Sequence, residues 1–464
     1  MRAALSEYNY DWTLYAMFST AANTLNGSRK EYERMLPRVS TFRGIIEPVM
    51  ATGEPGKLFL QGMGEYLRRV VNAHQEGKKL CLTTFCQAPA LFWAMDIVPI
   101  LLEPMTVAGT LVHKGGTSEF MDYCVEKGFT ETSCSSQRGA LGAYLCGLAE
   151  PPDMVVIDTP GICDTNANSF SFFAAHENIP FYQLNYPPEL TADRSREYHR
   201  KDYRNLIAFL EEQTGKKLDP QRLAGVIAEM EKQDRLICDI QDLQRVVPSP
   251  VPIIYNFFIY ALRFTMGGRK EATDMLAAML ECAMDNAANG RSGFLSGEER
   301  ARGLFVYIDH YSMNLPLWMF LEEKGITHLG GILDRFYQAR APYAGDAGYS
   351  LSMDSLDAMI DTLADANSRL PMVKQIRGPY DARDMWLEEA LSLAKLYNAD
   401  FAVYSGTPGC RNTWGMVKLL ARDLEKAGIP TLVLNSDAFD DRVESWSNTK
   451  HRIEEFLEVR RIAG

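Results

Sequence analysis

The sequence predicts an α/β protein in which two related domains, each built on a parallel β-sheet, are joined by a helical segment and preceded by a helical N-terminal region. Two observations lead to this fold. Apolar runs of strand length alternate with helical patterns on both sides of a purely helical stretch, and such alternation is typical of parallel sheets covered on both faces. In addition, one stretch of the first half returns in similar form in the second half, which indicates a duplicated unit.

The composition is that of a globular protein. The chain has 464 residues, of which 46% are hydrophobic and 23% charged, and its 48 basic and 60 acidic residues give a net charge of −12. These proportions exclude disordered, collagen-like and coiled-coil classes, and the negative charge argues against nucleic-acid binding. The longest apolar stretches, such as 251–264, are too short to span a bilayer, so no membrane contact is expected.

The cysteines and the N-terminal residues predict a cytoplasmic location. Nine cysteines are spread over a long chain, unlike the dense framework of a secreted disulfide protein. Glu7 and Asp11 interrupt the stretch in which a signal peptide would be uniformly apolar. In a reducing compartment, cysteines serve as core residues, catalytic thiols or metal ligands.

The first half of the chain divides into a helical region and an α/β domain. Residues 1–76 are predicted to be helical and mostly polar, and residues 77–195 to form the first α/β domain. Its strands are expected at 78–85, 98–104, 154–161 and 179–188, with helices at 89–97 and between 118 and 149.

The second half begins with the helical segment, residues 196–298. There, Gly215 is a predicted helix stop, and Asp219-Pro220 predicts an N-cap followed by the first helical residue. The strand–helix alternation returns in the second α/β domain, residues 299–464. Its strands are expected in GLFVYID (303–309), GITHLGGILD (325–334), ADFAVYSG (399–406) and IPTLVLNSD (429–437).

The internal repeat joins residues 154–185 to residues 401–435. Both stretches contain a strand, the tripeptide Thr-Pro-Gly, a cysteine, a helix, and Ile-Pro before a strand that ends in Leu-Asn. The cysteines are Cys163 and Cys410. We therefore expect two related Rossmann-like domains in one chain.

Each repeated cysteine is predicted to lie just beyond a strand, at the start of a helix, where open α/β sheets place their ligands. A helix N-terminus favours an anion and should lower the pKa of a thiol there, and soft metals bind thiolates. The alternative is that Thr-Pro-Gly forms a turn and the cysteine is a small filler. Matching positions in both copies favour the ligand interpretation.

A third cysteine, Cys134, belongs with this pair. It stands among hydroxyl residues in ETSCSSQRG, with Arg138 one turn further on. Ser133, Ser135 and Ser136 are candidate capping residues and donors to sulfur. Three thiolates gathered by the fold, with one open position, would suit a cubane iron–sulfur cluster that has a reactive iron. The chain has no CxxC pair, so zinc-ribbon and ferredoxin sites are disfavoured.

The other cysteines are assigned first to the core: Cys124, Cys146, Cys238 and Cys282 lie in predicted helices. Cys81 and Cys86 flank the end of the first strand with C-x4-C spacing, and Cys86 is the better candidate for an additional ligand. His310 is the one histidine at a predicted strand end, and it is expected to line the active site.

The three cysteine regions resemble those of the 2-hydroxyacyl-CoA dehydratase family, which also includes benzoyl-CoA reductase subunits. The resemblance rests on ETSCSSQRGALG, VIDTPGICDTNANSF and SGTPGCRNTWGMVKLLARDLEKAGIPTLVLNSDAFD, and it extends over roughly residues 78–455. It implies one [4Fe–4S] cluster per chain, held by Cys134, Cys163 and Cys410, with its fourth iron open to water or substrate.

The resemblance also implies partners and a reaction. A related second subunit is expected to form a heterodimer with the chain, or the chain to form a homodimer, and an ATP-dependent iron–sulfur activator protein to deliver an electron. The electron would convert an acyl-CoA substrate into a ketyl radical anion that expels its leaving group. We expect an anaerobic lyase that removes water from a 2-hydroxyacyl-CoA. Ser135, Arg138 and His310 are the predicted catalytic residues, and Asp164 and Arg411 are expected beside them.

The sequence departs from the family at one turn. Dehydratase subunits of the family usually carry a Pro-x-Glu-Leu-like turn after the first strand, whereas residues 88–91 read Ala-Pro-Ala-Leu, so the substrate-side acid–base residues are undecided.

Three alternatives to a dehydratase stay open. The chain could be an aryl-CoA reductase subunit, a double-cubane reductase that also uses Cys81 and Cys86, or a non-catalytic partner subunit. The sequence has no phosphate-binding loop or dinucleotide signature, so the energy for the electron is expected from another protein.

Overall fold

The structure is a computed structural model. It describes residues 9–26, 46, 48–84, 89–112, 118–158, 163–186, 192–295, 297–306, 314–331, 351–370, 373, 385–407 and 409–462. None of the helices in these ranges combines the length and the hydrophobicity needed to cross a membrane.

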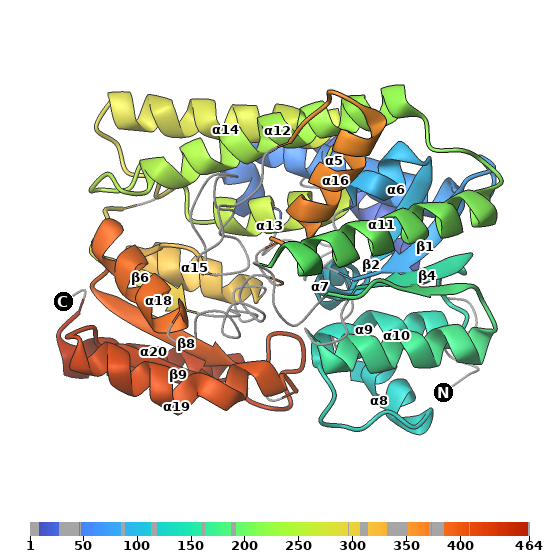
Figure 1. The fold of residues 1–464 in the computed structure, drawn as a ribbon. Helices are drawn as coiled ribbons and strands as arrows, with labels where there is room; N and C mark the ends of the chain where they lie inside the picture. The colour runs from blue at the N-terminus through green and yellow to red at the C-terminus, as the bar shows by residue number, and fades with distance from the viewer. Residues whose placement is uncertain are drawn as a thin grey trace.

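Two four-stranded parallel sheets form the centres of the two halves (Figure 1). The first has the order β2-β1-β4-β5 and the second the order β7-β6-β8-β9. Counted within its own half, each sheet therefore has the strand order 2-1-3-4, which confirms the duplication predicted from the repeat. The strands are β1 (Lys79–Thr83), β2 (Ile97–Leu101), β4 (Met154–Ile157), β5 (Phe181–Gln183), β6 (Ala301–Val306), β7 (Ile326–His328), β8 (Phe401–Gly406) and β9 (Thr431–Asn435).

Four strands are buried along their whole length, as parallel strands covered on both faces should be. Every residue of β2, β4, β6 and β8 is buried, and in β1 every residue but Lys79. The helices of the first half are α6 (Ala90–Ala94), α7 (Leu102–Val112), α8 (Ser118–Glu126), α9 (Ser135–Leu145) and α10 (Asp164–Glu177); those of the second are α15 (Leu315–Lys324), α16 (Leu356–Asn367), α18 (Met385–Leu396), α19 (Arg411–Lys426) and α20 (Trp446–Arg460).

One strand is shorter than predicted. The sequence indicated a strand to residue 104, but β2 ends at Leu101 and α7 begins at Leu102. The apolar run continues across the junction because both elements are buried there, so apolar content alone did not mark the end of the strand. This correction places Glu103 in the first turn of a helix at the carboxyl end of the sheet.

The middle segment is helical, as predicted, and α12 and α14 lie across one side of the molecule (Figure 1). Gly215 ends its helix with a φ of 67°, and the Asp219 side chain accepts from Gln221 N at the start of the next one. Helix α13 is buried at every position, which explains its apolar sequence. The segment comprises α11 (Asp193–Thr214), α12 (Pro220–Leu243), α13 (Tyr255–Met266) and α14 (Lys270–Ala288).

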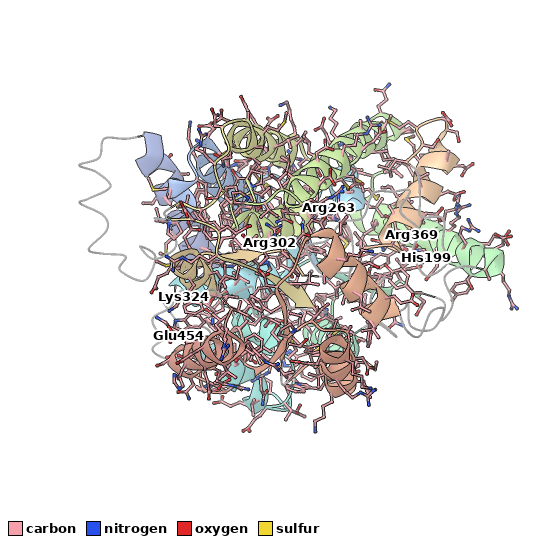
Figure 2. The ribbon with its side chains drawn as sticks, turned by 90° about the vertical axis from the view of Figure 1, so that its left-hand side faces the viewer. His199, Arg263, Arg302, Lys324, Arg369 and Glu454 are labelled. Atoms are coloured by element: carbon pink, nitrogen blue, oxygen red, sulfur yellow. The ribbon has the colours of Figure 1, made fainter. Side chains whose placement is uncertain are left out.

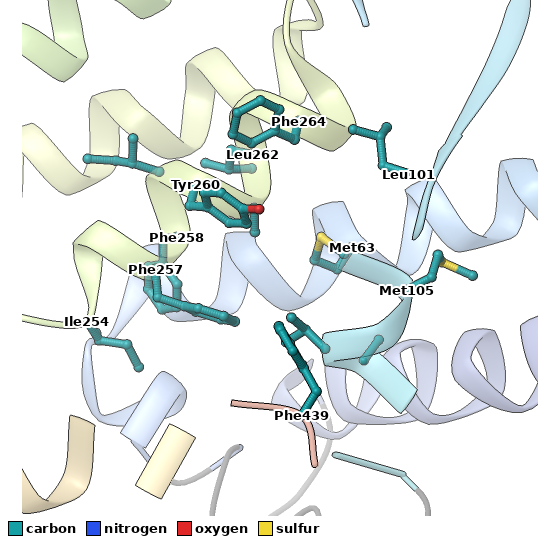
Figure 3. Close-up of a cluster of buried hydrophobic side chains, with 14 of the residues drawn as sticks. Met63, Leu101, Met105, Ile254, Phe257, Phe258, Tyr260, Leu262, Phe264 and Phe439 are labelled. Carbon is teal, nitrogen blue, oxygen red and sulfur yellow. The ribbon is translucent and has the colours of Figure 1, made fainter. Parts of the chain in front are cut away.

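The N-terminal region is more deeply buried than its mostly polar sequence suggested. Its helices are α2 (Tyr10–Asn26) and α5 (Glu54–Asn72). Eleven of the 19 residues of α5 are buried, because its apolar residues recur on one face while charged residues fill the other. Helix α5 thereby contributes to the main core, together with α7 and α13 (Figure 3).

Helix α16 belongs to the second half of the sequence but packs on the side of the first sheet. It contacts α11 and α12 there. Figure 2 shows His199 of α11 near Arg369, which follows α16. On the opposite side of this view, Lys324 and Glu454 form an ion pair of 3.0 Å between α15 and α20.

Candidate functional site

Each of the three predicted ligand cysteines is the N-cap of a helix. Cys134 precedes α9, Cys163 precedes α10 and Cys410 precedes α19. Cys163 and Cys410 also follow the third strand of their respective sheets, β4 and β8. Since that strand adjoins the first strand, where the strand order reverses, both cysteines lie at the position where α/β folds bind ligands.

The fold brings these cysteines together from both halves of the chain. A Cβ on Gly409 would lie 2.7 Å from the Cα of Cys134 and 2.8 Å from its nitrogen. Only glycine permits this approach, which places the neighbouring Cys410 against the first domain. The charge of Cys410 acts on the thiols of both other cysteines, and that of Cys134 acts on Cys163. The three thiols therefore face a common region.

The thiols of Cys134 and Cys163 are not acidified as the helix N-termini led us to expect. Burial raises the pKa of Cys134 to about 12 and that of Cys163 well above its usual value, and the nearby thiol of Cys410 adds to both shifts. Loss of solvation outweighs the helix dipole here. Metal binding at these two cysteines therefore has to displace protons.

Two hydrogen bonds orient the sulfur atoms. The hydroxyl of Ser136 lies 3.0 Å from Sγ of Cys134, and the backbone N–H of Asn166 donates to Sγ of Cys163 over 3.5 Å. Such donors support a thiolate ligand from behind. Within the described part of the chain, no three His, Cys, Asp or Glu side chains are spaced to hold one metal ion. Thiols are the donors that iron–sulfur clusters use, and in a cluster each sulfur atom binds a different iron.

A group of buried polar side chains lies beside Cys163, and the sequence did not reveal it. Glu103 accepts a hydrogen bond from the amide of Gln137, and its charge acts on Cys163. Among the described residues, no partner is found for Glu103 Oε2, for Gln137 Oε1 or for either side-chain atom of Asn166. Burial raises the pKa of Glu103 to about 7. Unpartnered buried polar atoms are costly, so this group is suited to a polar ligand.

A signal for Glu103 was present in the sequence. It lies two residues beyond the end of strand β2, and ligands of α/β folds bind outside the carboxyl ends of the strands. Because the strand was predicted to extend over 98–104, Glu103 was assigned to the strand itself and was not considered as a site residue.

The predicted catalytic residues have the following positions. Ser135 is buried and donates to Asp437 Oδ1 over 2.6 Å. Arg138 is also buried, and its Nε donates to the carbonyl of Ser133 over 3.0 Å. Asp164 is exposed at the start of α10. The side chain of Arg411 and the whole of His310 lie outside the described residues.

The other cysteines among the described residues lie in strand β1 or in, or at the end of, a helix. Cys81 lies in the middle of β1, buried in a second apolar cluster with residues such as Leu206 and Met230. Cys124 and Cys238 are buried and Cys146 and Cys282 half-buried within or at the ends of helices. Cys86 lies outside the described residues.

Comparison with known proteins identifies relatives that match most of the chain. Residues 86–459 match the family described as 2-hydroxyglutaryl-CoA dehydratase, D-component. The chain is similar to the (R)-phenyllactyl-CoA dehydratase alpha subunit of Clostridium sporogenes, with 23% identity across 84% of this chain and 91% of the relative. It is also similar to the (R)-2-hydroxyisocaproyl-CoA dehydratase alpha subunit of Clostridioides difficile, with 22% identity across 86% and 94%. The protein therefore belongs to the 2-hydroxyglutaryl-CoA dehydratase D-component family.

Proposed function

We propose that the chain is the iron–sulfur subunit of a 2-hydroxyacyl-CoA dehydratase. The observation that carries this proposal is the convergence of three N-cap cysteines, two from the first half and one from the second. The similarity to alpha subunits of two such dehydratases supports the reaction class.

Cys134, Cys163 and Cys410 would hold one [4Fe–4S] cluster. Bound there, the cluster supplies one-electron reduction and, at an iron without a protein ligand, a site for substrate oxygen. The three cysteines provide charge and position, and Ser136 and the N–H of Asn166 stabilise two of the thiolates. The mid-strand position of Cys81 supports a single cluster over a larger one that would need further cysteines.

Glu103 is our candidate for the proton-transfer group. Loss of water from a 2-hydroxyacyl thioester breaks the bond between C2 and the hydroxyl oxygen, and that oxygen needs a proton to leave as water. The protonated carboxyl of Glu103 supplies it, and its free Oε2 is available to do so. The carboxylate is then reprotonated by the hydrogen lost from C3. The amide of Gln137 orients the carboxyl, and the amide of Asn166 is available to orient the substrate.

The proposal includes partners that the isolated chain does not contain. We propose a related second subunit, as for the alpha subunits it resembles, or a second copy of this chain. We also propose an ATP-dependent iron–sulfur activator as the electron source, an acyl-CoA substrate, and the reducing cytoplasm as the location.

Iron analysis of cysteine variants tests the ligand assignment. After anaerobic reconstitution, the wild-type protein is expected to hold about four irons per chain, and Cys163→Ala or Cys410→Ala to lose most of them. Cys238→Ala is the matched control, since this cysteine is buried in α12. Full iron in both Cys163→Ala and Cys410→Ala would disprove the assignment.

Turnover distinguishes the reaction. With its partner, activator and ATP, the protein should release water from a 2-hydroxyacyl-CoA and should be inactive without the activator. Consumption of two electrons per benzoyl-CoA without loss of water from hydroxyacyl-CoA would identify an aryl-CoA reductase instead.

A further inference from the structure

A tight turn at residues 436–443, which follows β9, connects the second domain to the first directly at the cysteines. Asp437 stabilises this turn. Its Oδ1 accepts hydrogen bonds from the backbone N–H groups of Phe439 and Asp440, over 2.9 and 3.1 Å. The same oxygen accepts from the hydroxyl of Ser135 over 2.6 Å. Ser135 is 0% exposed and Asp437 6%, so this contact between the domains is shielded from water.

The conformation of this turn places Phe439 in the core of the other half. Figure 3 shows its ring among side chains of α5, α7 and α13, with Met63, Met105 and Phe257 around it. Phe439 is 6% exposed and belongs to the same apolar cluster as these residues. A buried aromatic ring is a strong anchor, and the hydrogen bonds to Asp437 help to hold the turn in the shape that presents it.

A further contact lies at the exposed rim of the turn. Arg442 donates to Asp440 within the turn and to Asp122 of α8, over 2.8 Å for the second bond. Both partners of that interdomain pair are about half-exposed, so it should add little stability.

Ser135 and Gly409 show why this turn matters for the site. Ser135 is the residue after Cys134, and Gly409, the residue before Cys410, packs on the backbone of Cys134. The Ser135–Asp437 hydrogen bond and the Gly409 contact therefore fix the same pair of cysteines from two sides.

We infer that the 436–443 turn is a lock between the domains, in which Asp437 and Ser135 are positioning residues that fix the separation of Cys134 and Cys410. This inference rests on the proposed function, because the two cysteines come from different domains and a shared cluster needs both at a set distance. Opening of the lock would move Cys410 away from Cys134 and release the cluster.

The experiment measures how fast the reconstituted protein loses iron to an excess of a ferrous-iron chelator under anaerobic conditions. Ser135→Ala removes the interdomain hydrogen bond and is expected to release iron about three- to tenfold faster than the wild type, the range for one buried hydrogen bond. Asp437→Asn retains a carbonyl oxygen as acceptor and should remain closer to the wild type.

Two control variants separate the lock from other effects. Asp122→Ala removes the exposed interdomain pair and should change the rate less than twofold. Asp219→Ala weakens α12, far along the chain from the turn, and reports what a general loss of stability does to iron release; it too should leave the rate within twofold.

The outcomes are distinct. A wild-type protein that takes up no iron would refute the proposed function. A wild-type protein that holds iron, with Ser135→Ala releasing it at the wild-type rate, would refute the lock alone. Should Ser135→Ala not fold, hydrogen exchange of the wild type decides: the amides of Phe439 and Asp440 should be strongly protected, and exchange at the rate of an open loop would refute the lock.

Discussion

At each of the three cysteines a helix begins, and this position determines what the sulfur can do. An N-cap side chain faces the free N–H groups of the first turn, so this position can direct a backbone donor at a sulfur atom. The Asn166 N–H at Cys163 is such a donor. Burial keeps the thiols of Cys134 and Cys163 protonated in the absence of metal, which protects them from oxidation.

The Glu103 carboxyl allows a prediction at the scale of one residue. Glu103→Gln keeps the shape and the hydrogen-bonding capacity of the side chain but removes the transferable proton. We expect turnover with activator and partner to fall about 10²- to 10⁴-fold, while the iron content stays at the wild-type level. Steady-state rates and iron analysis on the same preparation measure both.

The control for this variant is Asp11→Asn, which replaces another buried carboxyl, one that contacts Tyr144 in the last turn of α9, and should retain full turnover. A Glu103→Gln enzyme that retains wild-type turnover would show that Glu103 transfers no proton in the reaction. Loss of iron in that variant would instead assign Glu103 to the stability of the cluster.

At the scale of elements, local signals predicted the ends of helices well. The sequence Asp219-Pro220 marked the start of α12, and Asp219 Oδ1 accepts from Gln221 N over 2.8 Å. Asp219→Ala should lower the free energy of unfolding by about 1 kcal/mol, and Asp219→Asn, which keeps the acceptor, should lower it by much less. Urea unfolding of the metal-free protein measures both variants, and equal losses would show that the cap is unimportant.

The same local signals could not predict where α16 packs. Arg200 of α11 forms two hydrogen bonds with Asp365 of α16, over 3.0 and 2.5 Å. At the end of α16, Asn367 hydrogen-bonds Tyr186, whose hydroxyl donates to the buried Asp158 over 2.8 Å. These partners lie far apart in the sequence, so no local pattern could pair them.

In the candidate site, too, some features could be predicted from local sequence and others could not. Cys163 and Cys410 were predictable because a strand, a turn and a helix start are all local features, and the duplication marked them twice. The Ser135–Asp437 contact and the unpartnered amide of Asn166 depend on how the two halves meet. The composition of a segment carries no record of that contact, and the structure was needed to find it.

At the scale of the whole molecule, the N-terminal helix joins the first domain through a buried carboxylate. Asp11 of α2 is 0% exposed; it accepts from the backbone N–H of Glu150 over 2.7 Å and from the hydroxyl of Tyr144 over 3.4 Å. Burial raises the pKa of Asp11 from 3.8 to about 7, and the charge of Glu150 adds to the effect. The folded protein therefore holds a proton here that the unfolded chain releases near pH 4.

This difference in proton binding predicts how stability changes with pH. Because the folded-state pKa lies above the unfolded value, the stabilisation is complete below about pH 4 and is lost as the pH rises through about 7. Asp11→Asn lacks the titration but can keep the acceptor for Glu150. We expect the variant to gain about 1–3 kcal/mol of unfolding free energy relative to the wild type between pH 5 and pH 8.

Urea unfolding of both metal-free proteins at several pH values measures this gain. Glu76→Gln is the control of opposite sign. Hydrogen bonds from Arg68 and Lys78 lower the pKa of Glu76 to about 2. Its titration is therefore complete below pH 5, and its difference from the wild type should stay flat from pH 5 to 8. A flat difference for Asp11→Asn as well would mean that Asp11 is ionised in the folded protein, and that α2 is held by its backbone and apolar contacts alone.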